Sequence, residues 1–72
     1  MKTYTRNARF WEQTQIAFLH RAQLWAKGSE ARALIEIAQS EQWPEIASEH
    51  APASERVSPE ECAAVIFYKL LS

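Results

Sequence analysis

The chain has 72 residues, 47% of them hydrophobic and 24% charged, with a formal net charge of −1, which predicts one small folded domain over residues 1–72. Its single cysteine and single glycine exclude an internal disulfide, a cysteine-ligated zinc site and a glycine-rich phosphate-binding loop. One glycine and three prolines also leave too little turn material for an all-β fold, so the composition predicts an all-α fold.

The first predicted element is a long helix over about residues 7–27, because this segment contains neither proline nor glycine. Thr5 or Asn7 would cap its start, and Gly28 would close it in the left-handed conformation. Four aromatic residues recur every seven positions and form one stripe on a helix surface: Tyr4, Trp11, Phe18 and Trp25.

Two interpretations of this aromatic stripe stay open. The later helices cover it within one chain, or part of it is a seam with another chain. The stripe spans about 32 Å, whereas each later helix is about 20 Å long. Neither later helix of one chain is therefore long enough to cover the whole stripe. The sequence therefore predicts a homodimer or an obligate protein partner.

Two further main helices complete the predicted bundle. Ser29 would cap a helix over about residues 30–42, and Pro44 would begin a short helical turn. Ser58 and Glu61 form a capping box that starts a helix over residues 59–71. That last helix is apolar almost all round, so we expect it to be the most buried element.

Opposite charges divide the chain. Six basic residues against two acidic ones give residues 1–32 a net charge of +4, and two against seven give residues 33–72 a net charge of −5. The first helix carries a basic stripe on the side opposite the aromatic stripe. It consists of Arg9, Gln13, Ile16, His20 and Lys27, and Arg6 is adjacent to it. Ile16 is expected to be exposed in the middle of this stripe. An acidic series spaced by four follows later: Glu41, Glu45 and Glu49. For the basic stripe and for the acidic series, two interpretations stay open: a solvated surface or a surface that binds a partner.

Residues suited to catalysis or metal binding are scarce and scattered. Cys62 has apolar neighbours and is expected to be a small buried side chain, although its place in a first helical turn could lower a thiol pKa. His20 and His50 have no ligand partner at helical spacing. The sequence therefore predicts no enzyme activity, no metal and no cofactor.

The function expected from these features is a small cytoplasmic protein–protein interaction module, a regulator or inhibitor that works by occlusion. Its profile is typical of inhibitors that phages and plasmids encode against host or defence complexes. The alternative is a DNA-binding regulator of the helix-turn-helix type, because the segment from residue 30 to Glu49 could imitate that motif. No apolar run is long enough to span a membrane, and none suggests an export signal.

Overall fold

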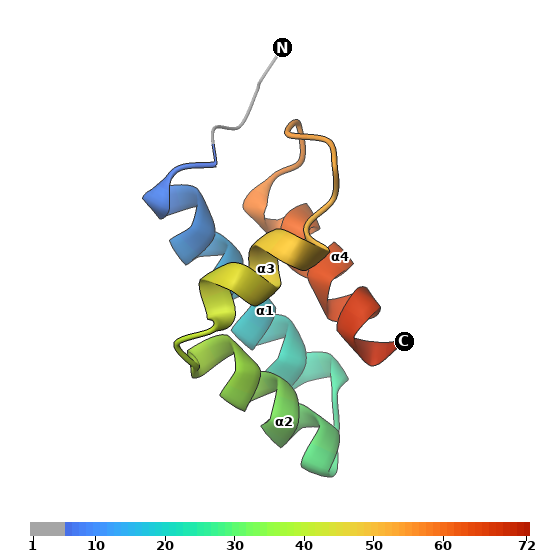
Figure 1. Ribbon diagram of the computed structural model, residues 1–72. Helices are drawn as coiled ribbons and strands as arrows, with labels where there is room; N and C mark the ends of the chain where they lie inside the picture. The colour runs from blue at the N-terminus through green and yellow to red at the C-terminus, as the bar shows by residue number, and fades with distance from the viewer. Residues whose placement is uncertain (1–5) are drawn as a thin grey trace.

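The structure, a computed structural model, describes residues 6–72, and helices are the only regular secondary structure within them (Figure 1). The chain order is α1 Ala8–Trp25, α2 Gly28–Gln39, α3 Trp43–His50 and α4 Pro59–Leu71. The predicted small all-α bundle is confirmed, with the turn after Pro44 forming a fourth short helix. No described helix has both the length and the apolar character needed to cross a membrane.

Helix α1 begins at a side-chain cap. The Asn7 side-chain oxygen accepts a hydrogen bond of 2.9 Å from the backbone N–H of Phe10, as one of the two predicted caps requires. The helix ends at Trp25, two residues before the predicted boundary, because Ala26 has extended backbone. Lys27 therefore lies beyond the helix and is not part of its surface.

Gly28 lies at the junction between α1 and α2 and allows the chain to change direction there. Its φ of +61° is the predicted left-handed conformation, but the residue opens α2 instead of closing α1. Lys27 is the N-cap of α2 and offers no side-chain cap. The predicted cap by Ser29 is therefore wrong, because the helix starts one residue before it.

Helix α2 ends three residues earlier than predicted. The Ser40 hydroxyl and the Ser40 backbone N–H both donate to the carbonyl oxygen of Ile37, at 2.9 Å and 3.2 Å, which closes the helix. Pro44 then falls in the first turn of α3, where a missing N–H costs nothing. His50 is the last residue of α3, with its Nδ1 2.9 Å from the Ile46 carbonyl oxygen.

Helix α4 has the predicted boundaries. The Ser58 hydroxyl accepts a hydrogen bond of 3.2 Å from the backbone N–H of Glu61. Five of its residues are buried, more than in any other described helix. It is therefore the most buried described helix, as expected, although Tyr68 is 60% exposed and Leu71 39% exposed.

The core lies where α1 packs against α4, with α2 beside α1 and α3 resting on α4 and α2 (Figure 1). Aromatic rings meet at its centre: the Phe18 ring lies 4.9 Å from that of Trp43 and 6.1 Å from that of Phe67. Thr14 is fully buried among them because its hydroxyl donates to the Phe10 carbonyl at 2.9 Å.

The buried side of α1 differs from the predicted aromatic stripe. Its buried residues recur every four positions: Phe10, Thr14, Phe18 and Ala22. This line winds around α1, because α4 and α2 pack on different sides of it: Gln15 donates to the Ala38 carbonyl of α2, whereas Gln13 and Ala17 line a hollow with Glu60 of α4. It crosses the seven-residue stripe at Phe18, so Trp11 is half-buried and Trp25 is exposed, while Tyr4 lies outside the described residues.

Candidate protein interface

Large apolar side chains remain exposed along α1. Ile16 is 61% exposed, Leu24 64% and Trp25 67%. Two neighbouring hollows of about 400 Å³ and 190 Å³ join them: Ile16 lines the first, and Leu24 and Trp25 line the second. Ala17, His20 and Glu60 line both hollows, so the surface between the three apolar side chains is continuous.

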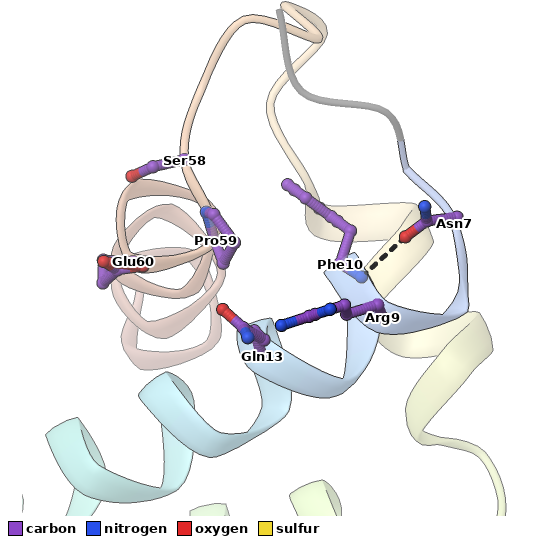
Figure 2. Close-up of a pocket in the computed structure, with 7 residues that line it drawn as sticks. All are labelled: Asn7, Arg9, Phe10, Gln13, Ser58, Pro59 and Glu60. Carbon is purple, nitrogen blue, oxygen red and sulfur yellow. Dashed lines mark hydrogen bonds between the residues drawn. The ribbon is translucent and has the colours of Figure 1, made fainter.

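A third hollow of about 410 Å³ lies where the first turns of α1 and α4 meet (Figure 2). Figure 2 shows Gln13 extending from α1 toward Pro59, with Arg9 lying along α1 beside it. Glu60 lines this hollow as well as the other two. The Glu60 side of α4 therefore borders the exposed side of α1 over several turns.

Two more large apolar side chains, Tyr68 and Leu71, are exposed on α4. Leu71, eleven residues after Glu60, lies on the same side of α4 as Glu60, and Tyr68, eight residues after it, is turned by about 80°. All five large hydrophobic side chains that are exposed in the described chain belong to α1 or α4, and none to α2 or α3. We define the α1–α4 face as Ile16, His20, Leu24, Trp25, Glu60, Tyr68 and Leu71.

The structure brings together most of the predicted basic stripe. Arg9, Gln13, Ile16 and His20 are all exposed on α1 and line the three hollows. Lys27 is separated from them, because it lies in the α1–α2 junction.

Arg6 also turns away from the basic stripe, although it is adjacent to it in the sequence. Its guanidinium donates to the carbonyl oxygens of Pro52 and Ser54, at 2.6 Å and 2.7 Å. Those acceptors are 46 and 48 residues away, so no local pattern indicates this arrangement.

Sequence reasoning missed three members of the surface or its rim: Arg21, Leu24 and Glu60. Trp25 belongs to the predicted aromatic stripe, and only the packing of the bundle shows that it is left uncovered within one chain. The exposed position of Glu60 beside α1 follows from the register between α1 and α4, which no local pattern gives.

The predicted acidic series lies elsewhere. Glu45 and Glu49 are exposed on α3, whereas Glu41 is in the turn before it, so the three do not share one helix. The Trp43 ring of α3 meets the Phe18 ring of α1 inside the core. Glu45 and Glu49 lie on the other side of α3 from Trp43, and neither lines any of the three hollows.

The Cys62 thiol is buried in the core and not exposed at any surface. Burial raises its pKa, and the nearby Arg6 charge and a hydrogen bond with Thr14 only partly oppose this. The alternative that the first-turn position of Cys62 lowers its thiol pKa is therefore wrong. Among the described residues, no group of three His, Cys, Asp or Glu side chains is arranged to hold a metal ion.

No protein-family model, curated protein or solved structure matches this chain. Inference about its function therefore comes from the chemistry of its surfaces. Among these, the α1–α4 face is the one that combines exposed large apolar side chains, hollows and charge.

Proposed function

We propose that this chain is a cytoplasmic, non-catalytic protein–protein interaction module. It works as a regulator or inhibitor that covers a protein surface, the class that includes inhibitors encoded by phages and plasmids. Its working surface is the α1–α4 face, and either a second copy or a different protein covers that face.

One observation carries this proposal: within the described residues 6–72, all five exposed large hydrophobic side chains, 39–67% exposed, belong to two adjacent helices, α1 and α4. Small proteins rarely leave a contiguous apolar surface in water unless another molecule covers it. Exposed tryptophan and arginine are also the residues that contribute most to protein interfaces. Trp25 and Arg21 line the same hollow, which is the arrangement expected of an interface centre.

Photo-crosslinking in living cells tests the proposal. Leu24 is replaced by photoreactive benzoylphenylalanine, and the matched control carries the same group at Ala33, an exposed position on α2. We expect position 24 to give one dominant adduct, whose mass identifies the covering protein, and position 33 to give none. Equal or absent crosslinking at the two positions would contradict the proposal.

A DNA-binding regulator is the second candidate, favoured by the short turn of residues 40–42 between α2 and α3. The helix that would enter the major groove is α3, whose exposed residues include Glu45 and Glu49 and no arginine or lysine. Carboxylates there would repel phosphates. A salt-dependent gel shift with duplex DNA at low ionic strength would favour this candidate over the protein-binding one.

A further inference from the structure

We infer, building on the proposed function, that a second copy of this chain covers the α1–α4 face. In the resulting dimer, α1 of each copy packs against α4 of the other.

Exposed apolar side chains stand on both helices of the face, Ile16 and Leu24 on α1 and Tyr68 and Leu71 on α4. The hollows lie between α1 and the first turn of α4. Helices pack by placing the protruding side chains of one into the grooves of the other. A second copy offers the same protruding side chains and the same hollows, so each copy can fill the hollows of its partner.

The charges around the apolar residues are divided between the two helices. Arg9 and Arg21 line the hollows from α1, whereas Glu60 lines them from α4 and Glu61 is exposed beside it. A surface that is basic along one helix and acidic along its neighbour complements another copy of itself. A twofold axis along the groove places α1 of one copy over α4 of the other and forms this charge contact twice.

The same charges argue against other arrangements of two copies. Packing α1 on α1 would bring the Arg9 and Arg21 side chains of both copies together. Docking the acidic surface of α3 onto α1 would join two different surfaces of the molecule, and such a contact tends to give an open chain of copies instead of a closed dimer. The exposed positions Glu45, Ser48 and Glu49 of α3 also offer no large apolar side chain to fill the hollows.

Sedimentation equilibrium of the full chain tests the dimer. We expect a mass of twice 8.3 kDa at micromolar concentration. Leu24→Glu places a carboxylate in the middle of the interface and should weaken dimerisation by at least about 30-fold. The matched control is Ala33→Glu, which introduces the same charge at an exposed position of α2 and should leave the mass unchanged.

Mixing charge-reversed chains tests the arrangement of the helices. The first variant carries Arg9→Glu with Arg21→Glu, and the second carries Glu60→Lys with Glu61→Lys. Each alone would face like charges in both contacts and should stay monomeric. An equimolar mixture restores attraction in both contacts. In one contact, the reversed α1 of the first variant meets the reversed α4 of the second. In the other contact, the native α1 of the second variant meets the native α4 of the first. The mixture should therefore form a heterodimer, which a role of these residues inside one chain would not produce.

Trp25 supplies a second readout, because its indole is exposed in the single chain and covered in the dimer. Its emission should shift to longer wavelength on dilution, and circular dichroism should show that every variant keeps its helices.

A wild-type chain that stays monomeric, a Leu24→Glu variant that stays dimeric, or a mixture that stays monomeric each overturns the inference. A crosslink from position 24 to a different protein also overturns it, while leaving the proposed function standing.

Discussion

The Arg6 guanidinium donates a hydrogen bond of 2.6 Å to the carbonyl oxygen of Pro52, 46 residues further along the chain. The same nitrogen donates to the Ser54 carbonyl oxygen at 2.7 Å, and the guanidinium carbon lies 6.0 Å and 5.9 Å from the ring centres of Phe10 and Trp11. One side chain thus ties the segment before α1 to the connector between α3 and α4. The connector forms neither a helix nor a strand, so this contact helps to hold it in place.

Arg6→Ala should lower the free energy of unfolding by about 2 kcal/mol, because two charge-assisted hydrogen bonds and a contact with two rings disappear together. Urea denaturation measures the change. Arg6→Lys is the control for charge, since it keeps the cation without the planar group that reaches both carbonyls, and it should recover less than half of the loss. Equal stability of Arg6→Ala and wild type would show that the connector is held by other contacts.

Phe18 and Trp25 occupy the same predicted stripe but should respond very differently to truncation. Phe18 is fully buried, so Phe18→Ala should cost about 3–5 kcal/mol, which approaches the whole stability of a small domain. Trp25→Ala should change the stability of a single chain by less than about 0.5 kcal/mol, because the ring is in water. Denaturation in the Leu24→Glu background measures the single chain. Similar losses at both positions would contradict the burial pattern.

Local signals in the sequence account for three of the four helix starts in the described residues. Asn7 and Ser58 are caps whose side chains bond to the nearby backbone, and Pro44 opens a helix because of its own fixed φ. These interactions span three or four residues, so a pattern of residue types reveals them. The end of α2 was placed too late, because Ser40 has no sequence signature that distinguishes a closing serine from a helical one.

The candidate interface could be predicted only in part, because it depends on the register between helices. Spacing along α1 placed Ile16 and His20 correctly on an exposed side. It could not reveal that α4 and α2 pack on different sides of α1 and leave Trp25 uncovered. Nor could it place Glu60 beside α1, since that position results from packing between residues more than 30 positions apart.

Gly28→Ala should destabilise the chain by about 1 kcal/mol, because a φ of +61° is strained for any residue with a side chain. A Cβ added there meets no atom within 4 Å, so the cost is backbone strain and not a clash. Gly28→Asn should lose about half as much, since asparagine tolerates this conformation. Thermal melting measures both. Ser29→Ala is the matched control and should melt like wild type, because Ser29 caps no helix; a large loss there would contradict the observed start of α2.

The buried Cys62 thiol should make the chain less stable in alkali. Burial raises its pKa above the ordinary value of 9.0, so the folded chain keeps the thiol proton that the unfolded chain releases. The unfolded state therefore binds fewer protons above pH 9, and the free energy of unfolding falls as the pH rises. At lower pH both states keep the thiol proton, so the thiol adds no pH dependence to stability there. Cys62→Ala removes this titration without adding another. Urea denaturation from neutral pH to about pH 10 should thus show a steeper alkaline decline for wild type than for Cys62→Ala. Parallel curves would mean that the thiol ionises as readily in the folded core as in water.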